Sequence, residues 1–277
     1  RGLANNTNTA TTTADANETF QNAILFLFRH VHSKDIFEAF YKRDLAKRLL
    51  LNKSVSIDME RSFLTLLKTE CGGAYTSKME GMFKDMDLSR DVMQSYSSYL
   101  AGINNNNNNN NESSSMQNNN NNNKVDMEVQ VLTTGYWPIY PMHSALVLPP
   151  ELTFHQQQFD TYYKTKYQGR RIAWQYSLGQ CIVRGNFPKM KGKPCELVIS
   201  LCQTVVLMCF NTRENSNDDG LTIVDIMKQT GLEDRGETER VLQSLSMGRD
   251  GTRVLIKTEY ELDGVTKLKT KLKRPVS

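Results

Sequence analysis

Cys195, Cys202 and Cys209 recur at intervals of seven residues, a regular spacing that could indicate a metal site. Cys195 comes before a predicted strand, however, whereas Cys202 and Cys209 would lie about two turns apart on the helix that follows. No histidine lies at an ordinary zinc-ligand spacing from them. We therefore interpret these thiols as small hydrophobic side chains, and we expect no metal and no other cofactor.

Catalytic motifs are absent from the sequence. It contains no Walker, GxGxxG, GxSxG or HExxH block, and no cysteine lies beside a histidine as a nucleophile would. His30 and His32 would point to different sides of one helix, and His143 and His155 have no partner pattern. We therefore expect a protein that is not an enzyme and has no catalytic residues.

Lys42, Arg43 and Lys47 form a basic group that suggests binding. Arg43 and Lys47 are one helical turn apart and lie opposite an apolar stripe, with Lys42 beside them. Such a face can simply be solvated, or it can attract the acidic tail of a partner and raise the encounter rate. Arg48 falls nearer the stripe, so we expect a carboxylate or a carbonyl to pair with it.

Four amphipathic helices are predicted in the first part of the chain, because apolar residues recur there at spacings of three and four. Ser56 is the expected N-cap of the third helix, and Gly72 and Gly73 are its expected stop. The fourth helix is predicted over residues 89–100. The apolar positions of the four helices are Phe20, Ile24, Leu27 and Val31; Phe37, Tyr41, Leu45 and Leu49; Met59, Phe63, Leu66 and Leu67; and Val92, Tyr96 and Tyr99.

The composition divides this half of the chain into three segments. Residues 1–19 are mostly Asn, Thr and Ala, and we expect a disordered entry. Residues 20–101 hold the helices and should form part of a helical bundle. Residues 102–124 contain two asparagine runs and no apolar face that could offset the entropy of ordering, so we predict a disordered insertion.

Residues 125–210 are predicted to form an α/β region. A helix over about 150–168 should begin at Pro149 and Pro150 and stop at Gly169. Apolar residues elsewhere in this region alternate with polar ones, which predicts a small sheet of at least three strands. The positions assigned to the sheet are Met127, Val129, Val131 and Leu132; Ile172, Trp174, Tyr176 and Leu178; and Leu197, Ile199 and Leu201.

Residues 211–277 have the outline of a winged helix. A helix around Leu221–Met227, a GLED turn, a second helix through Val241–Leu245 and an extended Val254–Lys257 follow in order. A winged helix can place its second helix in DNA, but four carboxylates crowd the start of this one and would oppose phosphate contacts. A role in protein interaction is therefore favoured.

The overall composition limits the compartment and the partners. A net charge of +4 and a pI of about 8.7 do not by themselves indicate a nucleic-acid partner; basic residues would have to be clustered to do so. No apolar stretch reaches the roughly 20 residues of a membrane span, and no signal peptide is visible. The odd number of cysteines, five, argues against a complete disulfide framework. We expect a protein of the cytoplasm and nucleus.

Several sequence blocks in order resemble the cullin family. They cover roughly residues 20–257 without the asparagine-rich insertion, and FEAFYKRDLAKRLL looks most like the cullin that works with the damaged-DNA-binding adaptor. The blocks are SKDIFEAFYKRDLAKRLL, KTECGG, SKMEGMFKDM, LTTGYWP, GRRIAWQYSLGQC, ELVISLCQTVVLMCFN, GLED, VLQSL and RVLIK.

The resemblance implies a mainly α fold with α+β parts, namely a helical bundle, a small α/β sheet and a winged helix. It also implies a non-catalytic scaffold of a ubiquitin ligase, whose sheet receives a strand of a RING-box protein. The RING recruits a ubiquitin-charged conjugating enzyme, and the family's basic groove for the acidic tail of that enzyme maps to Lys42, Arg43 and Lys47. A cullin exchange factor and a modifier-removing complex are further implied partners.

The sequence departs from the family pattern at both ends. The N-terminal repeats that bind a substrate adaptor are missing, and the chain stops before the second winged helix, which carries the lysine for a ubiquitin-like modifier. We therefore expect the chain to be a piece of something longer, with a C-terminally incomplete first winged helix. The alternative is a winged-helix nucleic-acid-binding protein with a helical dimerisation segment.

Overall fold

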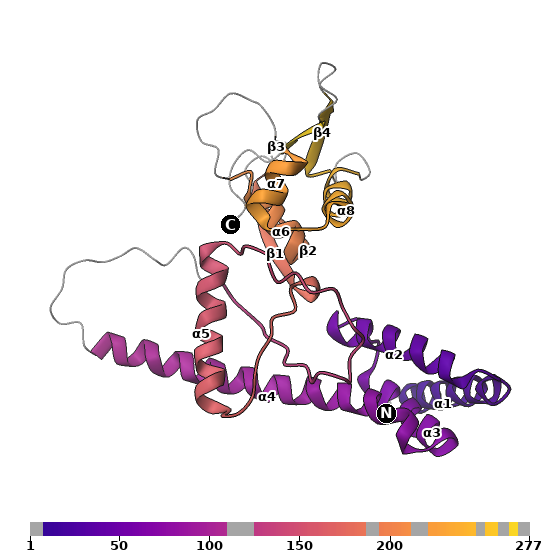
Figure 1. The fold of residues 1–277 in the computed structure, drawn as a ribbon. Coiled ribbons are helices and arrows are strands. Elements are labelled where there is room, and N and C mark those ends of the chain that lie inside the picture. Colours follow the sequence, from indigo (N-terminus) through magenta and orange to yellow (C-terminus); the bar gives the residue numbers. More distant parts are fainter. Residues whose placement is uncertain are drawn as a thin grey trace, which may run out of the picture. The chain divides into compact units, whose positions relative to one another are not determined.

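The computed structural model describes residues 8–109, 125–186, 194–211, 221–247, 253–259 and 266–270. They form two compact units (Figure 1). Unit 1 takes the described residues up to Asn109 together with residues 128–139. Unit 2 takes residues 125–127 and the described residues from Tyr140 onward.

Unit 1 is built on the long helix α4. Helices α2 and α3 pack on α4, and α1 packs on α3. Figure 1 shows these three shorter helices gathered near the first part of α4. The helices are α1 (Asn8–Arg29), α2 (Lys34–Leu50), α3 (Ile57–Cys71) and α4 (Gly73–Asn109).

The predicted boundaries of α3 are confirmed. The Ser56 hydroxyl accepts a hydrogen bond from the Met59 backbone N–H at 3.3 Å, which satisfies one of the unpaired donors of the first turn. Gly72 ends the helix with a φ of 85°, in the left-handed region that glycine adopts without steric cost. The cap and the stop therefore fix both ends of α3 locally.

The inner face of α2 is also as predicted, whereas that of α1 is not. Leu45 and Leu49 of α2 are buried. Among the α1 side chains from Glu18 onward, Gln21, Leu25 and Phe28 are buried. The predicted Phe20 and Leu27, and Val31 just after the helix, are exposed. Apolar residues occur on more than one side of α1, so the sequence pattern could not say which side would meet α3.

Two helices are longer than predicted. α1 begins at Asn8, so the described part of the expected disordered entry is helical. α4 runs through the predicted fourth helix and on to Asn109, and therefore includes the first residues of the asparagine-rich insertion. Extending a helix adds one hydrogen bond for each residue fixed, so an existing helix can continue into a weakly favourable sequence. Residues 110–124 lie outside the described residues.

Unit 2 contains two small sheets, four α-helices and one 3₁₀ helix among its described residues. β1 and β2 form an antiparallel pair in which Val183 lies opposite Leu197. The second sheet has the order β3-β5-β4, with antiparallel neighbours. The elements are α5 (Pro150–Lys166), η1 (Tyr176–Leu178), β1 (Gln180–Asn186), β2 (Pro194–Ser200), α6 (Leu201–Met208), β3 (Leu221–Thr222), α7 (Ile223–Thr230), α8 (Arg235–Ser246), β4 (Leu255–Glu259) and β5 (Thr266–Thr270).

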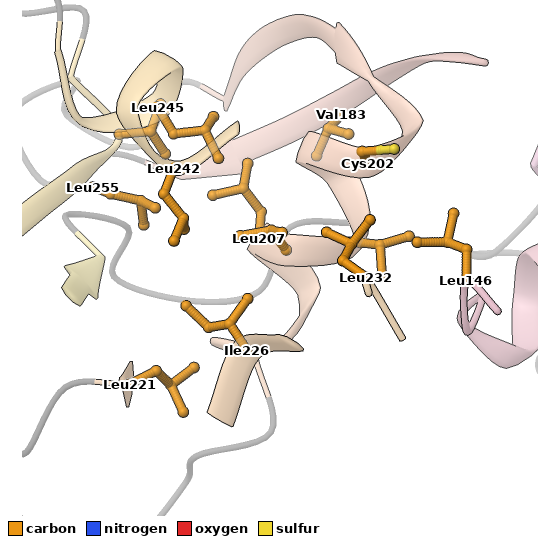
Figure 2. Close-up of a cluster of buried hydrophobic side chains, with 13 residues drawn as sticks. Leu146, Val183, Cys202, Leu207, Leu221, Ile226, Leu232, Leu242, Leu245 and Leu255 are labelled. Atoms are coloured by element: carbon orange, nitrogen blue, oxygen red, sulfur yellow. The ribbon is translucent and has the colours of Figure 1, made fainter. Parts of the chain in front are cut away.

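The core of unit 2 forms around the short apolar helix α6. Figure 2 shows Leu207 of α6 with Leu242 and Leu255 on one side and Leu146 and Leu232 on the other. All five side chains belong to one buried cluster. Because α6 is apolar nearly all round, it can lie between the hairpin β1–β2 and the helices α7 and α8.

The strand predicted over residues 127–132 is wrong. The backbone there is extended, but Met127, Val129, Val131 and Leu132 lie in no strand of the described structure. Alternating apolar and polar residues predict an extended backbone with one buried side, but they do not show that another strand lies beside it. In this segment the backbone donors find side chains of α4 in place of a strand.

The strand predicted at Ile172–Leu178 is also wrong. Ile172 and Trp174 lie in irregular backbone, and Tyr176 and Leu178 form the short 3₁₀ helix η1. The strand that does form, β1, begins just after it at Gln180. Its residues Cys181 and Val183 alternate with exposed ones, a signal that the sequence interpretation missed.

The third predicted strand is partly confirmed. Leu197 and Ile199 lie in β2, whereas Leu201 is the first residue of α6. Ser200 and Gln203 form a capping box, in which each side chain accepts a hydrogen bond from the other's backbone N–H, at 3.2 and 2.8 Å. This box begins a helix where the alternation alone would continue a strand.

The C-terminal elements follow the predicted order in part. Both helices, α7 and α8, and the extended segment, β4, are found. β3 and β5 were not predicted, and β5 pairs with both β3 and β4. The winged-helix interpretation of this region stays a prediction.

Candidate partner-binding surfaces

The extended segment 127–132 is held along α4 by a ladder of side chains. The backbone N–H of Val129 donates to Sδ of Met93 at 3.3 Å, and that of Val131 donates to Oγ of Ser89 at 2.8 Å. Both acceptors lie on one face of α4, four residues apart. The helix thus binds every second backbone donor of the segment.

The ladder continues at Asp85, a carboxylate that is 3% exposed. One of its oxygens accepts from the Thr133 backbone N–H and from Nε1 of Trp137, both at 2.7 Å. The other oxygen accepts from the Thr133 hydroxyl at 2.8 Å. A buried carboxylate normally requires such compensation, and here it fixes the turn that follows the segment. The sequence interpretation missed Asp85, although SKMEGMFKDM was noted as a block.

The opposite edge of the segment is open. In an extended chain successive residues turn their N–H groups to opposite sides, so those of Glu128, Gln130 and Leu132 point away from α4. No described residue accepts a hydrogen bond from these three groups. An open row of backbone donors and acceptors is a template for another strand.

A cavity of about 480 Å³ lies beside this segment in unit 1. Its apolar lining comes from α2, α3, α4 and the segment itself, and includes Leu49, Ile57, Phe83, Met86, Met93 and Val129. The rest of the lining is polar or charged, so the cavity offers both apolar and polar contacts to a partner's side chain.

Three arginines at the cavity already have partners. Arg48 donates to both carboxylate oxygens of Glu60, at 2.5 and 2.9 Å, which confirms the predicted need for a partner. Arg61 pairs with Asp87 at 2.7 Å, and Arg90 pairs with the same carboxylate. These ion pairs make the cavity rim polar without giving it a strong net charge.

A second extended segment precedes η1 in unit 2. Trp174 donates from Nε1 to Asp160 at 3.1 Å, and its ring meets Phe159 edge-on, so the segment is tied to α5. Gln156 of α5 bonds the Tyr176 hydroxyl at 3.0 Å. No described residue hydrogen-bonds the backbone groups of residues 171–174. Side chains hold this segment too, and its backbone is open.

The hairpin β1–β2 exposes an apolar pair. Ile182 and Val198 are cross-strand partners, and each is 70% exposed. On the opposite face Val183 is buried in the core of unit 2. The pair is described as a two-stranded sheet, so both of its edges lack a described neighbouring strand.

The basic residues predicted on α2 lie where expected. Arg43 and Lys47 are exposed and lie on either side of Asp44, at 3.5 and 3.8 Å from its carboxylate. The Arg43 guanidinium also lies over the ring of the half-exposed Phe40, 4.8 Å from its centroid. Lys42 is half-buried. One carboxylate faces two cations here, so the exposed face stays net positive.

The predicted binding residues are divided between the two units. Val129, Val131 and Leu132 belong to unit 1 with the basic residues of α2, whereas Met127 belongs to unit 2. The other predicted sheet positions, residues 172–201, also belong to unit 2. Their role in holding a partner stays a prediction.

Other kinds of site find little support among the described residues. They contain no group of three or more His, Cys, Asp or Glu side chains that could hold a metal ion. All five cysteines are thiols, and burial raises the pKa of Cys181, Cys202 and Cys209 above the ordinary range. Over the described residues, the helices are too short or too polar to span a bilayer.

Comparisons with known proteins identify two family domains. A cullin alpha solenoid domain matches residues 3–93, and a cullin alpha+beta domain matches residues 131–272. Cullin-4A of Mus musculus is 44% identical over 242 residues, which cover 87% of this chain and 28% of that protein. Cullin-4A of Homo sapiens is 43% identical over 236 residues, or 85% of this chain and 27% of the relative.

More distant relatives show the same pattern. Cullin-4 of Dictyostelium discoideum is 42% identical over 215 residues, which cover 78% of this chain and 24% of that protein. The chain therefore spans about a quarter of the length of the curated relatives it matches. These relatives bear out both the family resemblance and the subtype that FEAFYKRDLAKRLL predicted.

Proposed function

The chain belongs to the cullin family, and we propose that it is part of the non-catalytic scaffold of a multi-subunit cullin–RING ubiquitin ligase. In this role it would hold a RING-box protein, whose RING positions a ubiquitin-charged conjugating enzyme. Ubiquitin would then pass to substrates in ubiquitin-dependent protein catabolism. The chain itself would contribute surfaces and no reacting group.

The open edge of segment 127–132 is the observation that carries this proposal. One edge is fixed to α4 through Met93, Ser89 and Asp85, so the other is held ready for a strand of the RING-box protein. Pairing of backbone groups would supply affinity, and the adjoining cavity would receive alternate side chains of the incoming strand. A segment that is already extended loses less conformational entropy on binding than a free loop.

The exposed cations of α2 would serve the conjugating enzyme. Lys42, Arg43 and Lys47 would attract its acidic tail, chiefly by raising the rate of encounter. Arg43 and Lys47 are exposed, and Asp44 offsets only part of their charge. Unlike strand pairing, such attraction weakens steeply with salt.

We propose that the remaining partners of the complex bind through other segments of a cullin. A substrate adaptor would bind through an N-terminal half, and a ubiquitin-like modifier would be attached to a second winged helix. A cullin exchange factor and a modifier-removing complex are proposed as further partners. We also propose that the protein acts in the cytoplasm and nucleus, where its thiols would stay reduced.

The alternative of a nucleic-acid-binding winged helix is not favoured. Asp234 caps α8 by accepting from the Gly236 N–H at 2.8 Å, and Glu237 and Glu239 lie in the next turns. The charge at the start of α8 is therefore unfavourable for a phosphate backbone.

Co-elution of this chain with a RING-box protein on size exclusion at high salt tests the proposal. The matched variants are Gln130→Pro, which removes an outward-facing N–H, and Gln130→Ala, which keeps it. We expect the proline variant to lose the complex and the alanine variant to retain it, with unchanged helical circular dichroism in both. Retention by Gln130→Pro would refute pairing at this edge.

Ala173→Pro applies the same test to the second extended segment, because Ala173 lies within the open residues 171–174. Loss of the complex with Ala173→Pro, but not with Gln130→Pro, would assign the strand to unit 2. Retention in both variants would exclude strand pairing at either segment. The acidic-tail role is tested separately by Arg43→Glu with Lys47→Glu, which should slow encounter with an acidic-tailed conjugating enzyme at low salt and leave RING-box binding intact.

A further inference from the structure

The end of α5 carries a cluster of cations that the proposed function does not use. Lys164 and Lys166 lie in the last turn of α5, and Arg170 and Arg171 follow the turn at Gly169, whose φ of 81° reverses the chain. All four cationic side chains are exposed. Four positive charges thus meet within eight residues, between Lys164 and Arg171. We call these four residues the α5 cluster.

Carboxylates compensate little of this charge. Asp160 lies 3.8 Å from Lys164 and also accepts the indole N–H of Trp174. Lys166, Arg170 and Arg171 form no ion pair with any described carboxylate. The negative end of the helix dipole accounts for cations inside the last turn, but Arg170 and Arg171 lie beyond it.

Aromatic rings hold two of these cations in place. The Lys166 ammonium donates to the Tyr162 hydroxyl at 3.1 Å and lies 5.5 Å from the centroid of the Tyr167 ring. The Arg170 guanidinium carbon lies 5.3 Å from the same centroid. Two cations on one ring can be no farther apart than the sum of these distances, roughly 11 Å, which an extended peptide spans in about three residues. Side chains fixed in this way lose less entropy when a ligand binds.

The rings are not available as stacking platforms. Tyr162 and Tyr163 are buried, and Tyr163 packs against Tyr167 with centroids 4.6 Å apart. Proteins that bind single-stranded nucleic acid commonly stack bases on free aromatic faces, and the α5 cluster offers none in the described structure. A cluster of cations without a free aromatic face favours a ligand that is bound through its carboxylates.

We propose that the α5 cluster is a docking site for an acidic peptide segment of a partner protein. Carboxylates about two to three residues apart would pair with Lys166, Arg170 and Arg171, and Lys164 would add to the attraction. Each exposed ion pair is worth at most about a fivefold change in affinity, so the site would act by steering and by adding to contacts made elsewhere. It lies in unit 2, whereas the basic face of α2 lies in unit 1.

Fluorescence anisotropy with a labelled peptide of alternating Asp and Glu tests this proposal on the whole chain. The charge-reversal variant is Arg170→Glu with Arg171→Glu, and the matched control on the other basic face is Arg43→Glu with Lys47→Glu. We expect the first variant to weaken binding roughly tenfold or more at low salt, and the control to change it less than twofold. Both positions are exposed, and Trp174 fluorescence would report a disturbed fold of unit 2.

Three results would overturn the proposal. One is peptide affinity that Arg170→Glu with Arg171→Glu leaves unchanged. Another is loss of binding in the α2 control alone, which would place the peptide on unit 1. The last is tighter, equally arginine-dependent binding of a single-stranded oligonucleotide of matched charge, which would make the cluster a nucleic-acid surface. If charge reversal unfolds unit 2, Arg170→Gln with Arg171→Gln gives the same comparison. None of these results depends on RING-box binding.

Discussion

Replacing Asp85 with alanine should destabilise unit 1 strongly, because this carboxylate ties the turn at residues 133–137 to α4. The substitution removes the acceptor of three hydrogen bonds, from the Thr133 N–H, the Thr133 hydroxyl and the Trp137 indole. Trp137 is 8% exposed, so its N–H would find little water in exchange.

The size of the effect follows from these contacts. A buried donor left without an acceptor costs about 1 to 3 kcal/mol, which applies to the Trp137 N–H. A lost hydrogen bond to a charged acceptor costs about 1.5 to 3 kcal/mol, which applies to the more accessible Thr133 N–H. We therefore expect a loss of roughly 3 to 5 kcal/mol in the free energy of unfolding. Asp85→Asn should cost only about 1 kcal/mol, because its amide oxygen can accept from both N–H groups while its NH₂ donates to the Thr133 hydroxyl.

Urea unfolding followed by tryptophan fluorescence measures this loss. The sequence has two tryptophans, Trp137 in unit 1 and Trp174 in unit 2, so a Trp174→Phe background reports unit 1 alone. With an m-value of about 2 kcal/mol/M, Asp85→Ala should lower the urea midpoint by roughly 1.5 to 2.5 M. The control is Asp87→Ala, which removes only exposed ion pairs to Arg61 and Arg90 and should cost under about 1 kcal/mol.

Two outcomes would refute the reasoning about Asp85. If Asp85→Ala and Asp87→Ala cost the same, the carboxylate does not anchor the turn. If Asp85→Asn is as damaging as Asp85→Ala, the negative charge matters more than the hydrogen-bond geometry. A confirmed anchor would also imply weaker RING-box binding in Asp85→Ala, since the open edge would no longer be held in place.

Three further predictions concern packing and ionisation. Gly81→Ala should destabilise unit 1 by about 1 to 3 kcal/mol, because the added Cβ would lie 2.5 Å from the Tyr136 ring. The control Gly73→Ala should be tolerated, because its Cβ would meet only Lys68 Cε, at 3.6 Å. Equal urea midpoints for the two variants would contradict this prediction. Gly231→Ala should unfold unit 2, because the φ of Gly231 is 72° and an added Cβ would lie 1.9 Å from the Ala145 carbonyl oxygen. Trp174 fluorescence measures this unfolding, and a folded variant would show that the contact can relax. Burial raises the pKa of Cys209 to about 11 in the folded state, so its neutral thiol stabilises unit 2 below about pH 8.5, and this contribution is lost as the pH rises through 11. The urea midpoint of unit 2 should fall between about pH 8.5 and 11, and it should fall less in Cys209→Ala than in the unchanged protein. An identical fall in the two proteins would exclude this thiol as the cause.

Local chemistry made several elements readable from the sequence alone. Ser56 and Gly72 bound α3 because capping and positive φ depend on residues within one turn, and the stripe of α2 was found because Leu45 and Leu49 share one face. The family resemblance was equally readable, because it rests on blocks of residue identity and needs no coordinates. The exposure of Arg43 and Lys47 followed from the stripe opposite them.

Partners distant in sequence were decided only by the tertiary structure. The alternation at Met127–Val131 correctly indicated an extended chain, but a strand also needs a neighbour, and α4 side chains took that place. The inner face of α1 depended on where α3 lies, and the role of Asp85 depended on Thr133 and Trp137, which lie 48 and 52 residues away in the chain. The spacing of apolar residues indicates which side of an element is buried. The hydrogen-bond partners of that element depend on which other elements pack against it.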